Sequence, residues 1–142
     1  FFSSALELEL NIIIMNNLIV DATTDKIFLT IIVNTNIYTC SYENSKINFE
    51  KLMIIINEFL KNNKYSLDDI DVIYINRGPG SFAGIRNSLS TIIALFLTKN
   101  IDYYCFSFKD FKETDSNKYE DVPQLCEKYK IKKNLINPIY LS

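Results

Sequence analysis

Residues 70–86 read IDVIYINRGPGSFAGIR, and this stretch decides the fold. Its first part, 70–76, is a short apolar run rich in β-branched residues, which is typical of a buried strand. After the glycines, the segment 82–99 repeats apolar residues at helical spacing, with Phe82, Ile85, Leu89, Ile92 and Phe96 on one predicted core face. A strand, a turn and a helix, followed by another strand at 103–108, predict a crossover connection and parallel pairing.

The turn concentrates residue types that are scarce elsewhere. Residues 77–86 hold all three glycines of the chain, both arginines and one of its three prolines, against a background dominated by Ile, Asn and Lys. The spacing fits neither a Walker A loop nor the Rossmann fingerprint. Two interpretations stay open: a turn that lets the helix pack close to the sheet, and a site for an anion or a partner. The residues concerned are Arg77, Gly78, Pro79, Gly80, Ser81, Phe82, Gly84 and Arg86.

Arg86 and Ser81 have opposite relations to the predicted helix. A cation in the first helical turn opposes the helix dipole by ~0.3–1 kcal/mol, so Arg86 calls for a carboxylate or an anionic partner. Asp21, at the end of the first predicted strand, is a candidate internal partner, with turn capping as the alternative. Ser81 is the best candidate to cap the helix by accepting a hydrogen bond from an amide two or three residues later. We expect the glycines to provide positive φ or close backbone approach.

The rest of the chain completes a βββαβαβ order. Turn residues separate three predicted antiparallel strands, and a helix with Ser45 at its start presents Phe49, Leu52, Met53, Ile56, Phe59 and Leu60 to the core. The predicted segments are strands at 17–24, 26–34, 37–42, 70–76 and 103–108, helices at 45–63, 82–99 and 122–131, a polar loop at 112–121 and a terminal strand or arm at 136–142.

Bulk composition fits one domain and excludes several chemistries. The 142 residues carry a net charge of −2, so no overall positive field recruits nucleic acid or an acidic membrane. The chain has no histidine, which excludes His-dependent catalytic systems and His metal ligands. The widely spaced Cys40, Cys105 and Cys126 indicate buried thiols in a reducing compartment. No apolar run reaches the ~18 residues of a membrane span.

Residues 1–14 stand apart from the rest. They begin with Phe and lack the basic start of a signal peptide, and Met15 has the character of a natural start. We expect 1–14 to be an extension. Alternatively, Leu6, Leu8 and Leu10 alternate as in a strand that could add to a sheet edge.

The stretch SLDDIDVIYINRGPGSFAGIR (66–86) resembles the signature of the TsaB (YeaZ) family. Further resemblance lies in LIVDATTDKIFLTII (18–32), LMIIINEFL (52–60), YYCFSF (103–108) and NPIYLS (137–142). The resemblance implies an α/β fold of the actin/Hsp70/sugar-kinase-like (ribonuclease H-like) class. It also implies a cytoplasmic, noncatalytic scaffold or activator subunit of the machinery that makes threonylcarbamoyladenosine in tRNA.

The resemblance also implies partners. The chain would bind a TsaD-like transferase subunit, with a TsaE-like ATPase in the wider complex, ATP and metal on those partners, and tRNA only indirectly. Helical spacing places two stripes roughly opposite the core faces, and the family packs these helices against TsaD; solvent-facing stripes or a homodimer are the alternatives. The stripe residues are Ile47 and Ile54 on the first helix, and Ala83, Asn87, Ser90 and Ala94 on the second.

The sequence departs from the family in length. Family members carry a second domain of comparable size, whereas here we expect a TsaB-like N-terminal domain at 15–111 and a short C-terminal remnant at 112–142 packing on it. An enzyme of the same superfamily, kinase-like with ATP or glycoprotease-like, is the alternative function. The loop DATTDK (21–26) weakens it, because without glycine the backbone cannot closely approach phosphates. A small adaptor that has left the tRNA pathway is a third class.

Overall fold

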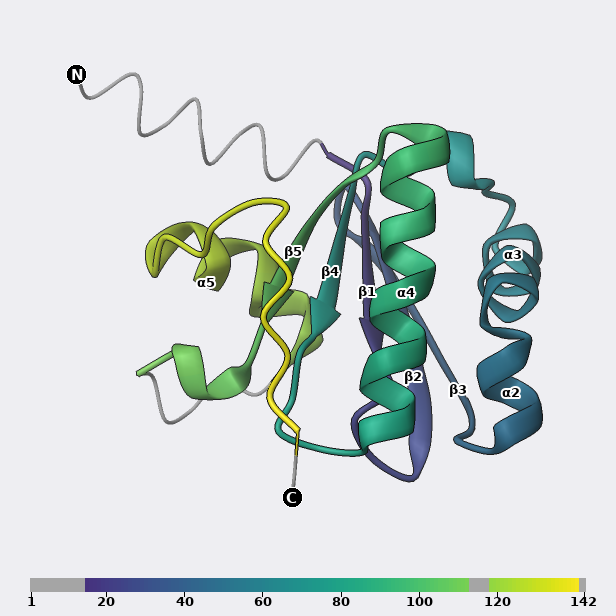
Figure 1. The fold of residues 1–142 in the computed structure, drawn as a ribbon. Helices are drawn as coiled ribbons and strands as arrows, with labels where there is room; N and C mark the ends of the chain where they lie inside the picture. Colours follow the sequence, from purple (N-terminus) through teal and green to yellow (C-terminus); the bar gives the residue numbers. More distant parts are fainter. Residues whose placement is uncertain (1–14, 113–117, 141–142) are drawn as a thin grey trace.

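The computed structural model describes residues 15–112 and 118–140, which form a five-stranded mixed sheet with helices on both faces (Figure 1). The strand order is β3-β2-β1-β4-β5. β1 pairs antiparallel with β2, and β2 with β3, while β1, β4 and β5 run parallel. The strands are β1 (Asn17–Asp21), β2 (Lys26–Val33), β3 (Asn36–Glu43), β4 (Val72–Asn76) and β5 (Asp102–Phe106).

The predicted meander and crossovers are confirmed. β1 and β4 are buried at every position, as continuous apolar runs of central parallel strands require. The turn between β2 and β3 places Asn34 in the left-handed region with φ 56°, which Asn tolerates better than most residues. The fold class expected from the sequence is therefore correct, and β3 is an edge strand with mostly exposed residues.

Three helices cover one face of the sheet: α2 (Lys46–Glu50), α3 (Leu52–Asn62) and α4 (Phe82–Lys99) (Figure 1). The single helix predicted at 45–63 is wrong in one respect, because it is interrupted at Lys51 between α2 and α3. Ser45 caps the start, with its Oγ accepting from the Asn48 amide at 3.3 Å. The predicted core residues Leu52, Ile56, Phe59, Leu60, Ile85, Leu89 and Ile92 are buried, Met53 and Phe96 partly so, and the side chain of Phe49 lies outside the description.

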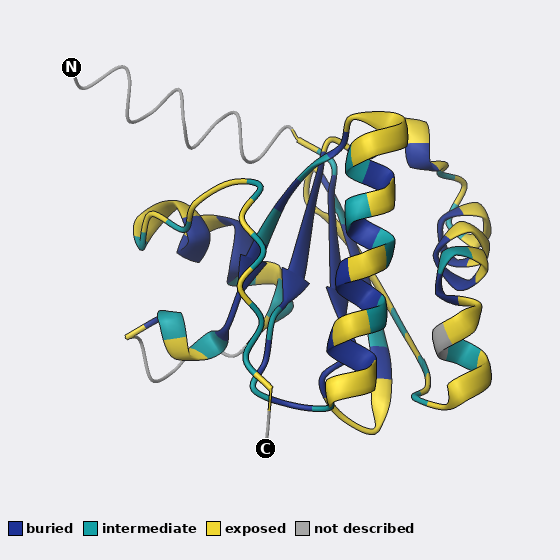
Figure 2. Cartoon of the chain, viewed as in Figure 1, coloured by how far each residue is buried: buried dark blue, intermediate teal, exposed yellow. Residues whose placement is uncertain are grey.

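The chain after β5 returns to cover the other face (Figure 2). A second apolar cluster joins the sheet residues Ile19, Val72, Tyr74 and Phe106 to Phe111, Val122, Leu125 and Cys126. α5 (Val122–Lys128) belongs to this layer and is shorter than the predicted helix at 122–131, because Lys130 adopts a left-handed conformation. The segment after β5 thus supplies the second layer of the core.

The terminal strand predicted at 136–142 is not formed over the described residues 136–140. Only an isolated bridge pairs Tyr140 with Gly80, and 141–142 lie outside the description, as do the predictions for 1–14. Within the described part of the chain, no helix is both long and apolar enough to cross a lipid bilayer.

Candidate functional site

The glycine loop joins the end of β4 to the start of α4 and turns its backbone amides inward. Arg77 N donates to Phe106 O at 2.7 Å, Gly78 N to Asn76 Oδ1 at 3.0 Å, and Ser81 N to Thr23 O at 2.9 Å. At the helix start, Ser81 Oγ accepts from Gly84 N at 3.3 Å, which confirms the predicted cap. The amides of Arg77, Gly78, Ser81 and Gly84 are therefore engaged within the protein and are not directed at a ligand.

Each glycine of the loop has a structural reason. Gly78 has φ 112°, a conformation that favours glycine, and Gly80 and Gly84 lie directly against the β1–β2 loop. A Cβ at Gly80 would strike the carbonyl oxygen of Thr23, and one at Gly84 that of Ala22. The glycines therefore permit close packing between the start of α4 and the end of β1, which agrees with the first of the two interpretations of the stretch.

Arg77 anchors the loop to two later segments. Its guanidinium pairs with the Asp110 carboxylate, with Nη2 2.6 Å from Oδ1 and Nε 3.3 Å from Oδ2, and Nη1 donates to Asn137 O at 3.0 Å. Its carbonyl accepts from the Ile139 amide at 2.7 Å. Asp110 also accepts from the Ser107 amide at 2.8 Å, so the ion pair extends into the turn after β5.

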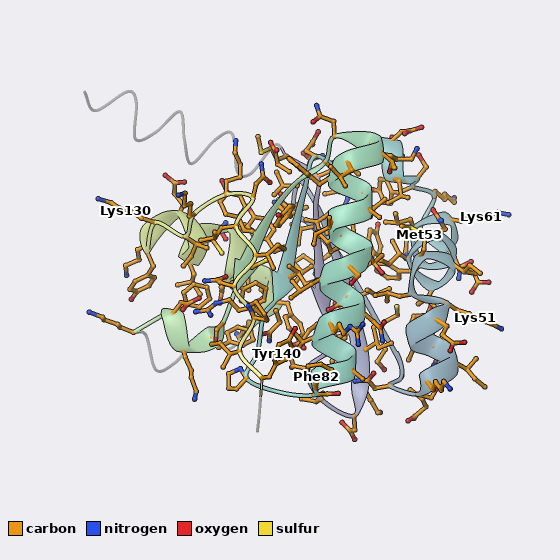
Figure 3. The ribbon with its side chains drawn as sticks, viewed as in Figure 1. Lys51, Met53, Lys61, Phe82, Lys130 and Tyr140 are labelled. Atoms are coloured by element: carbon orange, nitrogen blue, oxygen red, sulfur yellow. The ribbon has the colours of Figure 1, made fainter. Side chains whose placement is uncertain are left out.

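Residues 137–140 form a strap across the loop. The ring of Tyr140 lies 4.6 Å from that of Phe82, centroid to centroid, and Figure 3 shows the two side chains together at the start of α4. Phe82 is 52% exposed, so its predicted place on the core face is wrong. The first turn of α4 extends past the buried apolar cluster, and the ring packs on the strap instead. Pro79, between Gly78 and Gly80, follows a cis peptide bond.

Asp21 and Arg86 do not pair with each other in the described residues. Asp21 is buried, and its carboxylate accepts from Thr23 Oγ1 at 2.6 Å, from Asn76 Nδ2 at 3.0 Å and from Tyr119 Oη at 2.7 Å. Arg86 is exposed on α4. The internal pairing considered for Arg86 is therefore wrong, and the alternative holds: Asp21 Oδ1 accepts from the Thr23 amide at 2.9 Å, which is a turn-capping contact.

The outer side of α4 is exposed and nearly uncharged. Ala83, Ser90 and Ala94 are exposed and Asn87 is half-buried, so the predicted stripe lies at the surface (Figure 2). Leu97 continues the stripe and is 74% exposed, and Arg86 is the sole charged residue between 82 and 98 in the sequence. Solvent-facing helical surfaces usually carry many charged side chains, so this surface is unusually poor in charge for an exposed helix.

The neighbouring helices expose two isoleucines. Ile47 on α2 is 63% exposed and Ile54 on α3 is 55% exposed, as their predicted positions off the core stripe require. α2 and α3 lie beside α4 over the same face of the sheet (Figure 1). We name the set Ile47, Ile54, Ala83, Asn87, Ser90, Ala94 and Leu97 the outer helical face.

The described residues contain no group of three or more Cys, Asp or Glu that could hold a metal ion. Cys105 and Cys126 are buried and Cys40 is partly buried. Burial raises the pKa of the Cys105 thiol to about 12, and burial likewise raises the pKa of Cys126. Burial and the neighbouring Asp21 charge raise the pKa of the Tyr119 hydroxyl, so it stays protonated and donates. None of these groups is prepared for nucleophilic chemistry near neutral pH.

Sequence reasoning missed the residues that complete the loop: Asp110, Tyr119 and Tyr140. Asp110 stands three residues after Ser107, and that spacing is the signal of a capping box, which the structure forms. Nothing in the local sequence connects Tyr119 with Asp21 or Tyr140 with Phe82, because these contacts depend on how the chain after β5 returns to the sheet.

Comparisons with known proteins agree with the fold and with the loop. The family described as "TsaD: tRNA N6-adenosine threonylcarbamoyltransferase" has a model that matches residues 43–107. Two relatives are TsaB proteins, named for tRNA threonylcarbamoyladenosine biosynthesis, from Buchnera aphidicola. The protein of subsp. Baizongia pistaciae (strain Bp) is 32% identical, over 49% of this chain and 38% of its own length. The protein of subsp. Schizaphis graminum (strain Sg) is 29% identical, over 63% of this chain and 43% of its own length.

Among solved structures, YeaZ from Pseudomonas aeruginosa has the same fold. It superposes with a TM-score of 0.60 at 18% identity, over 66% of this chain and 44% of that one. The chain spans about two fifths of the length of the curated relatives that it matches. The TsaB relatives, the family match and the shared fold, taken together with the glycine loop, show that this chain is related to the TsaB (YeaZ) proteins over part of their length.

Proposed function

We propose that this chain is a noncatalytic scaffold or activator in tRNA threonylcarbamoyladenosine formation, and that it binds a TsaD-like transferase subunit through the outer helical face. The relatives are named for this biosynthesis, which supports the pathway. The observation that carries the contact is the row of small and apolar residues exposed along α4, beside Ile47 and Ile54. Small residues let a partner helix approach closely, and the isoleucines and Leu97 offer apolar area to bury.

The glycine loop supports this surface as a rigid junction. The amides of Arg77, Gly78 and Ser81 are bonded internally, the Arg77 guanidinium is paired with Asp110, and the strap at 137–140 closes the loop. We infer that the junction fixes the direction of α4 relative to the sheet. A helix held in this way presents its outer residues with little loss of conformational freedom on binding.

A noncatalytic role is supported by the engaged groups around Asp21. In a phosphate-handling site of this fold class, the region between the β1–β2 loop and the glycine loop would have to admit a ligand. Here Gly80 and Gly84 lie against the carbonyl groups of Thr23 and Ala22, and the Asp21 carboxylate accepts hydrogen bonds from three side chains. We therefore propose that ATP and metal act on the partner subunits, including a TsaE-like ATPase, and that the scaffold role itself requires no direct contact of this chain with tRNA.

The domain division is part of the proposal. Residues 15–111 would form the TsaB-like unit, and 112–142 would form a short segment that packs on it. The apolar cluster that joins the sheet to Val122, Leu125 and Cys126 supports this arrangement.

Co-purification with the TsaD-like protein of the same organism tests the proposal. Tagged chain should retain that protein through size-exclusion chromatography as a stoichiometric complex. The matched variants are Ala94→Glu, which places a carboxylate in the outer helical face, and Lys128→Glu on α5, on the other side of the sheet. Retention should be lost with the first and kept with the second. Equal retention by both variants contradicts the surface, and no retention by the unaltered chain contradicts the function.

A further inference from the structure

The segment that follows α5 concentrates positive charge. Residues 128–133 read KYKIKK and contain four of the chain's thirteen lysines, with no acidic residue among them. All four, Lys128, Lys130, Lys132 and Lys133, are exposed. Because the whole chain carries a net charge of −2, this concentration is local and gives one small surface an opposite sign.

The backbone of this lysine turn is fixed at both ends. α5 ends with Ile131 N donating to Cys126 O at 2.9 Å and Lys130 N donating to Glu127 O at 3.2 Å, and Lys130 is left-handed with φ 53°. Three residues further on, Asn134 N donates to Tyr103 O at 2.8 Å, and Asn134 Oδ1 accepts from Tyr103 N at 2.9 Å. The lysines therefore extend from an ordered turn.

Carboxylates of the protein neutralise the turn only in part. Lys133 Nζ lies 3.6 Å from Asp102 Oδ2, in an exposed pair that contributes little. For Lys130 and Lys132, the described part of the chain offers no carboxylate within ion-pair distance. Two ammonium groups of the turn are thus available to an external anion.

An aromatic ring lies within the turn. Tyr129 is half-buried against Phe111, with the ring centroids 5.7 Å apart, and the Lys128 ammonium lies 5.6 Å from the Tyr129 centroid. Grouped lysines suit the phosphates of RNA, and because the Tyr129 ring already contacts Phe111 and Lys128, the contact expected here is with phosphate and not with a stacked base.

The turn lies on the other side of the sheet from the outer helical face. Figure 3 shows Lys130 at one edge of the molecule, and Lys51 and Lys61 of the α2–α3 region at the opposite edge. An anion bound at the lysine turn would therefore leave α2, α3 and α4 free for a protein partner.

We propose that residues 128–133 form a docking site for the phosphate backbone of RNA, with Lys130 and Lys132 as its principal cations. Direct RNA contact by this chain goes beyond the scaffold role, in which contact with tRNA is indirect. The proposal depends on the charge and geometry of the turn and stands without the protein partner.

Fluorescence anisotropy of a labelled, unmodified tRNA transcript with the isolated chain tests the site. The variant is Lys130→Asn/Lys132→Gln, because Asn tolerates a left-handed backbone, and the control is Lys51→Gln/Lys61→Gln on the other side of the sheet. Loss of two phosphate contacts should weaken binding roughly ten- to hundred-fold at 50 mM salt. It should also reduce the slope of log affinity against log salt concentration by about 1.4. The control should bind as the unaltered chain does.

Two further measurements make the result decisive. Lys130→Arg/Lys132→Arg should keep the affinity, and thermal unfolding of all variants should show that the fold is intact. The proposal is overturned if Lys130→Asn/Lys132→Gln binds the transcript as tightly as Lys51→Gln/Lys61→Gln does. It is also overturned if the unaltered chain does not bind the transcript, or if it binds phosphatidylserine vesicles but not the transcript. Since no partner subunit is present, these outcomes are distinct from a failure of the scaffold role.

Discussion

The guanidinium of Arg77 and the carboxylate of Asp110 form a two-pronged ion pair between the end of β4 and the turn after β5. The two contacts are 2.6 and 3.3 Å, and the side chains are only 15% and 19% exposed. A pair so shielded and so aligned contributes more than a surface ion pair, because solvent screens it less and both prongs fix one geometry.

Removal of either member should therefore destabilise the fold. We expect Arg77→Ala and Asp110→Ala each to lower the free energy of unfolding in urea by roughly 1–3 kcal/mol. A double-mutant cycle should show a coupling of about 1 kcal/mol or more. The matched control is the exposed pair of Lys99 and Asp68, at 3.1 Å, whose coupling should stay under about 0.5 kcal/mol. Equal coupling in the two cycles would show that the Arg77 pair has no special role.

Gly84→Ala should destabilise the protein although alanine favours helices. The added Cβ would strike the carbonyl oxygen of Ala22, which is part of the backbone, so the start of α4 must move. We expect a loss of roughly 1–3 kcal/mol in chemical denaturation. Ser90→Ala, on the exposed side of the same helix, should change stability by less than about 0.5 kcal/mol. If Gly84→Ala stabilises the protein, the space between Gly84 and the Ala22 carbonyl must be large enough to hold a Cβ.

Ile54→Glu should separate binding from folding. Ile54 is 55% exposed, so a carboxylate there is solvated in the free chain and the melting temperature should barely change. At a buried interface, an unpaired carboxylate typically costs several kcal/mol, so affinity for a TsaD-like subunit, measured by calorimetry, should fall more than a hundred-fold. Asn57→Glu, at another exposed position of α3, is the control. Unchanged affinity would exclude Ile54 from the contact.

Arg86 and Asp21 should behave as independent residues. Because Arg86 is exposed and Asp21 bonds to Thr23, Asn76 and Tyr119, the stability effects of Arg86→Ala and Asp21→Ala should add within about 0.5 kcal/mol. Arg86→Ala alone should change stability little and should weaken partner binding, since Arg86 is exposed on α4 next to Asn87 of the outer helical face. Strong non-additivity in the denaturation cycle would show that Arg86 and Asp21 do interact in the folded chain.

The thiols should be protected in the folded chain. The thiolate is the reactive form, and burial raises the pKa of Cys105 to about 12, so at pH 8 very little of it is ionised. With a chromogenic disulfide reagent at pH 8, Cys40 should react first, because it is partly exposed, and Cys105 and Cys126 only after addition of urea. Rapid reaction of all three thiols in the native state would show that the core opens readily.

Apolar patterning predicted the elements: continuous apolar runs marked the buried strands β1 and β4, and helical spacing marked the half-buried helices α3 and α4. The segment 82–99 has the bounds of α4, and the β-branched runs became the five strands within a few residues. The same reasoning failed at Phe82, since a helical step of 100° does not reveal where the buried cluster ends along the helix. It also failed at Lys51, where the chain interrupts a continuous amphipathic pattern between α2 and α3.

The site was predictable only in its local part. The Ser81 cap and the glycine requirement follow from neighbours in sequence, so they could be anticipated. The partners of Arg77 and Phe82, and the partners of Asp21 other than Thr23, come from residues 33 to 98 positions away, and no local pattern encodes such distances. The sequence suggested Asp21 as the partner of Arg86 because their charges are opposite. A buried carboxylate needs hydrogen-bond donors, and in the structure Thr23, Asn76 and Tyr119 supply them.

The strap over the glycine loop has a consequence for synthesis of the chain. Arg77 Nη1 contacts the carbonyl of Asn137, sixty residues later, and the Ile139 amide bonds to the Arg77 carbonyl. A ribosome-bound nascent chain that has exposed β1 through α5 still lacks these contacts. The junction at the start of α4 therefore closes only when residues 137–140 have left the exit tunnel, so under the proposed scaffold role partner recognition should follow translation of this segment.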